Sequence, residues 1–121
     1  MAKLLVIDDD DAFCAYLSLC TGTLGHECES AGTLHDGIKK ADCGDFDLIF
    51  LDIFLPDAYG LDGIDDLQNV SSSPEIIIVT ACGDIEGPEI SLKKGAWYYL
   101  EKPPSTTTLQ LQIKRALQYR E

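Results

Sequence analysis

Residues 47–57 have the sequence DLIFLDIFLPD, in which the apolar run Leu48–Leu51 ends at Asp52. A run of this length, rich in branched residues, is typical of a strand that is buried on both faces. Two other runs have the same length and also end at polar side chains, which predicts three buried central strands. These runs are Leu4–Ile7, which ends at Asp8, and Ile76–Val79, which ends at Thr80.

Helical patterns separate these runs. Apolar residues recur at helical spacing from Phe13 to Leu24, and Gly25 follows as a helix end. Thr33 and Asp36 resemble a capping box that begins a short helix. The predicted order is strand then helix, five times, with strands at 4–7, 26–31, 48–51, 76–79 and 97–100 and helices at 13–24, 33–43, 61–67, 85–94 and 105–117.

Alternating strands and helices predict an α/β fold with a parallel sheet and helices on both of its faces. Right-handed crossover connections leave few topologies for such a chain. The 121 residues fit one domain, residues 1–121, and the sequence contains neither a linker nor an internal repeat.

The chain is strongly acidic, since 21 Asp and Glu residues against 9 Lys and Arg residues give a net charge of −12. Such a chain repels phosphate backbones and anionic lipid, so we expect no direct nucleic-acid binding and no membrane association. No apolar run approaches the ~20 residues of a membrane span. Five cysteines stand at irregular spacing without a C-x-x-C pair, which predicts free thiols in a reducing, cytoplasmic compartment.

Side chains able to do chemistry follow four of the predicted strands: Asp8 and Asp9, then Asp52, Thr80 and Lys102. Ligands of open parallel sheets bind at the carboxyl ends of the strands, so we expect these side chains to converge. Two carboxylates about 4 Å apart repel by about 4 kcal/mol at an effective dielectric constant of 20. A cation relieves that repulsion, and a hydrated site made only of oxygen ligands suits Mg²⁺.

The same set of side chains suits phosphoryl transfer. A bound Mg²⁺ would hold a phosphoryl group against the acids, while Lys102 and the Thr80 hydroxyl would bind further phosphoryl oxygens. An aspartate carboxylate can itself be the nucleophile, which gives an aspartyl phosphate.

Four segments together resemble the receiver domain of bacterial two-component response regulators, and the resemblance runs from Lys3 to about Arg120. It implies a flavodoxin-like (βα)₅ three-layer sandwich whose five-stranded parallel sheet has the order 2-1-3-4-5. The segments are Leu4–Asp10, Asp47–Asp57, Ile76–Ala81, and Gly95-Ala96 together with Tyr99–Pro103.

The resemblance also implies roles for the acidic residues. Asp52 would accept a phosphoryl group from a sensor histidine kinase or a phosphotransfer protein. The protein would not otherwise be an enzyme, beyond this self-phosphorylation and a slow self-dephosphorylation. The implied Mg²⁺ ligands are Asp8, Asp9, Asp52 and the backbone carbonyl of Phe54.

Further implied roles concern the switch. Lys102 would contact the phosphoryl group, across a cis peptide bond to Pro103. Phosphorylation would draw the Thr80 hydroxyl inward, and Tyr99 would turn in behind it. The changed surface would be that of the fourth helix, the fifth strand and the fifth helix. This surface would control an output, transcription, and is where a homodimer is expected.

Two further positions tune the lifetime of the phosphoryl group in the family. Phe54 stands two residues after Asp52, and Cys82 stands two residues after Thr80. Neither side chain positions an attacking water well, so we predict slow self-dephosphorylation.

Three features depart from the family pattern. Pro104 stands where an apolar residue such as phenylalanine is usual, so the entry to the last helix is expected to differ. Gly87-Pro88 is expected to shorten or loosen the fourth helix. The aromatic pair Trp97-Tyr98 opens the last strand, and Trp97 either packs inward or marks a partner surface.

Three other functions share parts of this pattern. An Asp-nucleophile phosphohydrolase of the haloacid dehalogenase type would use Asp8 and Asp10 as its D-x-D pair, but it needs a longer core or a cap domain. A phosphorylation-independent interaction module would have the same fold, although all five site positions are intact here. A flavin-binding domain would carry Ser, Thr and Gly after the first strand, where this chain has four aspartates.

The segment 113–121 continues a helical pattern without a cap. It resembles the receiver end of sigma-54 activator-type regulators, which continue into an ATPase and a DNA-binding output domain. We therefore expect a receiver excised from a longer regulator with a C-terminal output domain, the alternative being a single-domain regulator.

Overall fold

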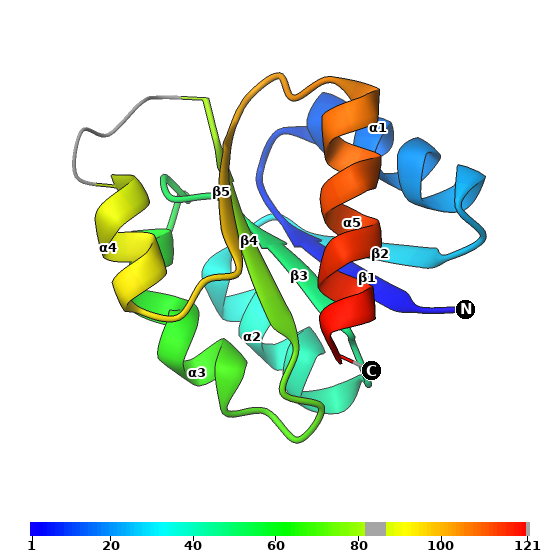
Figure 1. Cartoon of the computed structure of the whole chain (residues 1–121). Helices are drawn as coiled ribbons and strands as arrows, with labels where there is room; N and C mark the ends of the chain where they lie inside the picture. Colours follow the sequence, from blue (N-terminus) through cyan, green and yellow to red (C-terminus); the bar gives the residue numbers. More distant parts are fainter. Residues whose placement is uncertain (82–86, 121) are drawn as a thin grey trace.

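The computed structural model describes residues 1–81 and 87–120, and its strands form one five-stranded sheet (Figure 1). All neighbouring strands are parallel, and their order is 2-1-3-4-5 in chain numbering. The α/β class and the order that the resemblance implied are confirmed. The strands are β1 (Lys3–Ile7), β2 (Glu27–Ala31), β3 (Leu48–Leu51), β4 (Glu75–Thr80) and β5 (Tyr98–Glu101).

The helices follow the predicted order with two differences. The predicted third helix is split into a 3₁₀ turn and a short α-helix. The fourth helix begins at Gly87, with Pro88 in its first turn, where proline is tolerated; Ile85 lies outside the described residues. The elements are α1 (Asp11–Thr23), α2 (Leu34–Cys43), η1 (Gly60–Gly63), α3 (Ile64–Gln68), α4 (Gly87–Lys93) and α5 (Thr106–Arg120).

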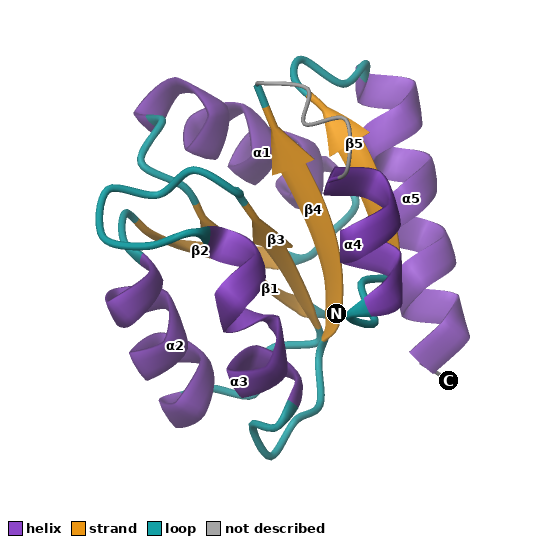
Figure 2. Ribbon diagram, turned by 90° about the vertical axis from the view of Figure 1, so that its left-hand side faces the viewer, coloured by secondary structure: helices purple, strands orange, loops and turns teal. Residues whose placement is uncertain are grey.

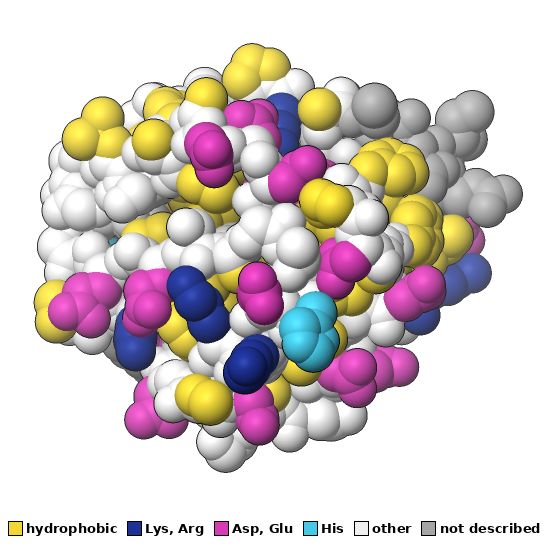
Figure 3. All heavy atoms as spheres, turned by 180° about the vertical axis from the view of Figure 1, so that it is seen from behind, with side chains coloured by type: hydrophobic (Ala, Val, Ile, Leu, Met, Phe, Trp, Pro, Cys, Tyr) yellow, Lys and Arg dark blue, Asp and Glu magenta, His cyan; other side chains and the backbone are white. Residues whose placement is uncertain are grey.

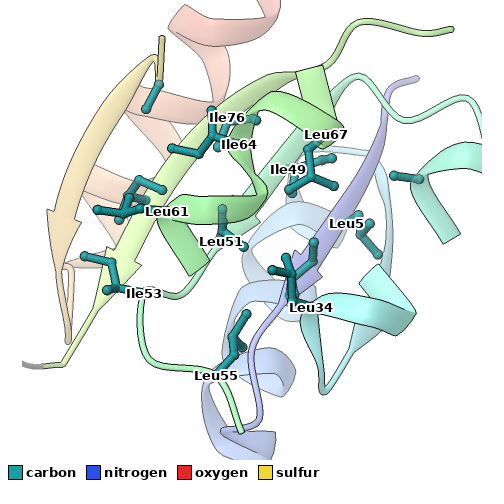
Figure 4. Close-up of a cluster of buried hydrophobic side chains, with 14 of the residues drawn as sticks. Leu5, Leu34, Ile49, Leu51, Ile53, Leu55, Leu61, Ile64, Leu67 and Ile76 are labelled. Carbon is teal, nitrogen blue, oxygen red and sulfur yellow. The ribbon is translucent and has the colours of Figure 1, made fainter. Parts of the chain in front are cut away.

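The sheet separates two apolar clusters, because successive side chains of a strand point to opposite faces. On β1, Leu5 and Ile7 face α2 and α3, whereas Leu4 and Val6 face α1 and α5. The central strands β3 and β4 alternate in the same way. Figures 1 and 2 show the resulting three layers, and Figure 4 shows the cluster beneath α2 and α3.

Local capping fixes where the helices begin. The Asp10 carboxylate accepts a hydrogen bond from the Phe13 amide at the start of α1 (3.1 Å). The Thr33 and Ser105 hydroxyls do the same for α2 and α5. Gly25 follows α1 with a φ of +84°, the left-handed conformation that glycine adopts at low cost.

The departures at the last strand have simple structural outcomes. Trp97 is half-buried against the α1–α5 cluster, and its ring centroid lies 4.6 Å from that of Tyr119, so Trp97 packs inward. Tyr98 is 41% exposed. Pro104 is buried, and its carbonyl accepts a hydrogen bond from the Tyr16 hydroxyl of α1.

Acidic side chains are spread over the face shown in Figure 3, with basic side chains (Lys or Arg) and a histidine between them. In the part of the chain that the structure describes, no helix is both long enough and apolar enough to cross a membrane.

Candidate functional site

The ends of β1 and β3 bring three carboxylates together. The Asp52 amide donates a hydrogen bond to the Ile7 carbonyl (3.0 Å), which places Asp52 beside Asp8. Carboxylate oxygens of Asp8, Asp9 and Asp52 all lie within 4.8 Å of one another. Asp8 and Asp52 are buried, at 2% and 7% exposure, and Asp9 is exposed. The predicted convergence of these acids is therefore observed.

The acids line a hollow of about 230 Å³ at the carboxyl ends of the strands. Thr80 ends β4 and Lys102 follows β5, and the backbone amide of Lys102 donates to the carbonyl of Thr80 (2.8 Å). All the residues expected at the strand ends thus meet in one place. Its described lining consists of Asp8, Asp9, Asp10, Asp52, Phe54, Thr80, Ala81 and Lys102.

Lys102 is held on the β1 side of the hollow. Its ammonium lies 2.6 Å from the Asp8 carboxylate and 3.6 Å from that of Asp10. The same ammonium lies 4.6 Å from the centre of the Phe13 ring, within the range of a cation–π contact. The peptide bond to Pro103 is cis, as the resemblance implied. The ion pair between Asp10 and Lys102 was not predicted from the sequence.

Charge and burial act on these groups together. Burial, followed by the nearby charge of Asp8, raises the pKa of Asp52 to about 6, although Lys102 acts in the opposite direction. Burial disfavours the charged form of Lys102, but the hydrogen bond and charge of Asp8, with the charges of Asp52 and Asp10, raise its pKa. Among the described residues that line the hollow, Lys102 is thus the one cationic side chain, and it lies among several carboxylates.

Asp52→Asn is expected to raise the free energy of unfolding at pH 7, in metal-free buffer, by about 1–2 kcal/mol. The raised pKa means that the folded state binds the Asp52 proton more tightly than the unfolded state. Wild-type stability therefore falls as pH rises from about 4 to 6, and the variant lacks this loss. Urea unfolding at pH 4 and pH 7 with EDTA measures the difference. An equal effect of the substitution at both pH values would contradict the explanation.

Thr80 and Tyr99 lie on the same face of the sheet. Thr80 is fully buried, and its hydroxyl has no hydrogen-bond partner among the described residues. Tyr99 is half-buried and pairs in register with Ile78, two residues before Thr80. Since side chains alternate along a strand, both residues face the α3 and α4 side. Cys82, the second proposed tuning residue, lies outside the described residues.

The loop after Asp52 contains two residues whose roles the sequence did not reveal. The Asp57 carboxylate accepts hydrogen bonds from the amides of Leu34 (2.9 Å) and His35 (3.0 Å), so it caps α2 together with Thr33. A Cβ atom at Gly60 would lie 1.9 Å from the Asp52 carbonyl oxygen. In the sequence, Asp57 and Gly60 stand out only as an acidic residue and a glycine in a loop, which is too little to predict either role.

Cys14 lies beside the site without being suited to nucleophilic chemistry. Its thiol lies 3.5 Å from the Asp8 carbonyl oxygen. Burial, with the charges of Asp8 and Asp11, raises the pKa of Cys14 to about 11. The thiol is therefore protonated at neutral pH, and Cys14 acts as a small, largely apolar side chain.

A family model described as "Response regulator receiver domain" matches residues 4–114. The chain is 34% identical over 115 residues to the transcriptional regulatory protein CusR of Escherichia coli K12, covering 95% of this chain and 51% of CusR. It is 32% identical over 116 residues to the DNA-binding transcriptional regulator NtrC of Azospirillum brasilense, covering 96% of this chain and 24% of NtrC. The chain thus spans about half of one relative and a quarter of the other.

Solved structures of receiver domains are also similar to this chain. A CheY-like response regulator receiver domain protein from Methanospirillum hungatei JF-1 superposes with a TM-score of 0.92 at 29% identity, covering 99% of this chain and 96% of the other. The beryllofluoride-activated NtrC4 receiver domain dimer superposes with a TM-score of 0.93 at 32% identity, covering the whole of both chains.

Proposed function

The chain belongs to the response regulator receiver domain family of two-component systems, and from this premise we propose that Asp52 is its phosphoacceptor. The donor would be a sensor histidine kinase or a phosphotransfer protein. The observation that supports the proposal most strongly is the meeting of three carboxylates and Lys102 in one hollow. Asp52 is the carboxylate at the end of β3, in the centre of the sheet order.

The transfer itself needs little covalent chemistry from the protein. An oxygen of ionised Asp52 forms a bond to the phosphorus atom, while the bond from phosphorus to the donor nitrogen or oxygen breaks and the donor keeps the electron pair. Lys102 would balance negative charge on the phosphoryl oxygens, and the unpartnered Thr80 hydroxyl would donate a hydrogen bond to one of them. The domain would turn over nothing else, so in this proposal it would not be an enzyme in the ordinary sense.

The acidic cluster fits a magnesium ion. Three oxygen ligands from Asp8, Asp9 and Asp52 lie close enough to share one ion, and Mg²⁺ prefers hard oxygen ligands. We propose the backbone carbonyl of Phe54 as a further ligand. When bound, Mg²⁺ would supply positive charge that offsets the carboxylates and the phosphoryl oxygens.

Mg²⁺ at about 100 times its dissociation constant is expected to raise the free energy of unfolding by about 2.7 kcal/mol. Urea unfolding with and without MgCl₂ measures the gain. Asp9→Asn removes an exposed ligand and should lower the apparent Mg²⁺ affinity about tenfold or more. Asp66 is an exposed acid on α3, so Asp66→Asn is the control and should leave the apparent Mg²⁺ affinity unchanged. Equal affinities in the two variants would rule out the proposed site.

Phosphorylation would act on the surface formed by α4, β5 and α5. We propose that the Thr80 hydroxyl moves toward the phosphoryl group and that Tyr99 turns into the space behind it, which changes this surface. A homodimer through the surface, a C-terminal output domain and control of transcription are part of the proposal; CusR and NtrC are transcriptional regulators. A cytoplasmic location stays a prediction from the cysteine pattern.

The family membership disfavours the phosphohydrolase and the flavin-binding alternatives. The matched family is neither the haloacid dehalogenase-type phosphohydrolases nor the flavin-binding domains. A phosphorylation-independent receiver remains the alternative, and the phosphoryl-uptake measurement described at the end of the Discussion separates it from the proposal.

A further inference from the structure

The loop between β3 and η1 folds back on itself directly after Asp52. Phe54 and Tyr59 form an isolated antiparallel bridge, and the Leu55 amide donates a hydrogen bond to the Ala58 carbonyl (3.2 Å). The two aromatic residues are five positions apart in sequence but lie opposite each other. The backbone therefore places their side chains as a cross-strand pair.

Phe54 stands at the rim of the site. Its neighbours Ile53 and Leu55 are buried at 0% and 9% exposure, and both belong to the cluster beneath α2 and α3 (Figure 4). Phe54 lies between them in sequence and is 51% exposed. It is also the only aromatic residue among the described residues that line the hollow with Asp52. The ring thus borders the opening without being fixed by the core.

Tyr59 supplies a fixed support for that ring. The two ring centroids are 6.0 Å apart with an interplanar angle of 59°, within the range of a tilted aromatic pair. Tyr59 is half-buried and packs against the cluster beneath α2 and α3. Asp57, between the two aromatic residues, ties the loop to the first amides of α2. Tyr59 is therefore fixed by its packing against the core, whereas the exposed Phe54 ring is supported by its contact with Tyr59.

We propose that Tyr59 is a positioning residue that holds the Phe54 ring over the rim of the site and so lengthens the life of the aspartyl phosphate. This inference rests on Asp52 being the phosphoacceptor. In hydrolysis, a water oxygen forms a bond to phosphorus as the bond to the Asp52 oxygen breaks; Asp52 regains its carboxylate and inorganic phosphate leaves. The water must approach opposite that breaking bond, through the opening that Phe54 borders. A ring held in place obstructs this approach, and an unsupported ring does not.

The test uses intact mass to measure the first-order loss of the phosphoryl group after acetyl phosphate is removed, and compares Tyr59 variants with the wild type. Tyr59→Ala is expected to shorten the half-life about three- to tenfold, whereas Tyr59→Phe, which keeps the ring, should restore it to within about twofold of wild type. Tyr59→Leu keeps apolar bulk without a ring and should behave as Tyr59→Ala, so it serves if the alanine variant folds poorly. Tyr119→Ala removes the ring contact with Trp97 at the C-terminal end of α5 and is the matched control, with an unchanged half-life.

Two further readings separate positioning from general damage to the fold. The uptake rate and the Mg²⁺ affinity of Tyr59→Ala should stay within about twofold of wild type, since the carboxylates are untouched. In the background of Phe54→Ala, adding Tyr59→Ala should shorten the half-life no further, because no ring remains to be held. A normal half-life in Tyr59→Ala and Tyr59→Leu, or fully additive effects in the double variant, would overturn the inference while leaving Asp52 as acceptor. Failure of the wild type to take up any phosphoryl group would overturn the proposed function and this inference with it.

Discussion

Gly60→Ala is expected to lower the free energy of unfolding by about 3 kcal/mol. The new Cβ atom would lie 1.9 Å from the Asp52 carbonyl oxygen, 2.9 Å from the Asp52 carbonyl carbon and 3.1 Å from the Ile53 Cα. All three are backbone atoms, so no side-chain rotation relieves the overlap. The strand end that carries Asp52 and the start of η1 at Gly60 must move apart instead.

Urea unfolding measures this loss, and Gly22→Ala is the matched control. Gly22 is exposed inside α1, and a Cβ atom there would meet nothing within 4 Å. The control should therefore gain about 0.5–1 kcal/mol from its better helix propensity. A Gly60→Ala protein with wild-type stability and wild-type Mg²⁺ affinity would show that Gly60 does not approach the Asp52 backbone this closely in solution.

Lys102→Met is expected to destabilise the metal-free protein by about 3 kcal/mol, because it leaves the Asp8 carboxylate buried without its cation. The two charged groups lie 2.6 Å apart, and their side chains are only 10% and 1% exposed. The carboxylate of Asp52 adds repulsion once the ammonium is gone. Saturating Mg²⁺ should recover much of the loss, since the proposed ion brings positive charge to the same acids.

Lys93→Met is the control for this prediction. Lys93 pairs with Glu89 at 3.0 Å on α4, but both side chains are more than 70% exposed. An exposed pair of this kind contributes about 0.3–0.5 kcal/mol at most. Urea unfolding in EDTA should therefore separate the two variants clearly. Similar small losses in both would mean that the Lys102–Asp8 contact is not a buried ion pair in solution.

The strands and the meeting of the acids could be predicted because both depend on local pattern. Four consecutive apolar residues define each central strand, and parallel strands bring whatever follows them to one edge. That logic put Asp8, Asp52 and Thr80 at one edge of the sheet, whereas the neighbouring positions of β1 and β3 were implied only by the family resemblance. It also accounts for Lys102, which follows the last strand.

The features that the sequence did not reveal depend on distances through space. Lys102 pairs with Asp8 and Asp10, a choice set by side-chain reach across the hollow. Asp57 caps a helix 22 residues earlier in the chain. The predicted third helix begins as a 3₁₀ turn, in which Gly60 approaches Asp52 and a Cβ atom at Gly63 would lie 2.6 Å from a methyl carbon of Leu34. A periodic apolar pattern carries none of this information.

The most direct test of the central claim is intact mass after incubation with acetyl phosphate and Mg²⁺, for wild type, Asp52→Asn and Asp65→Asn. Asp65 is an exposed acid on α3 and serves as the control. The wild type and Asp65→Asn should each gain the mass of one phosphoryl group, lost in base and absent when EDTA replaces Mg²⁺, while Asp52→Asn gains none. An adduct of equal yield on Asp52→Asn, or none on a folded wild type that binds Mg²⁺, would contradict the assignment of Asp52 as the phosphoacceptor.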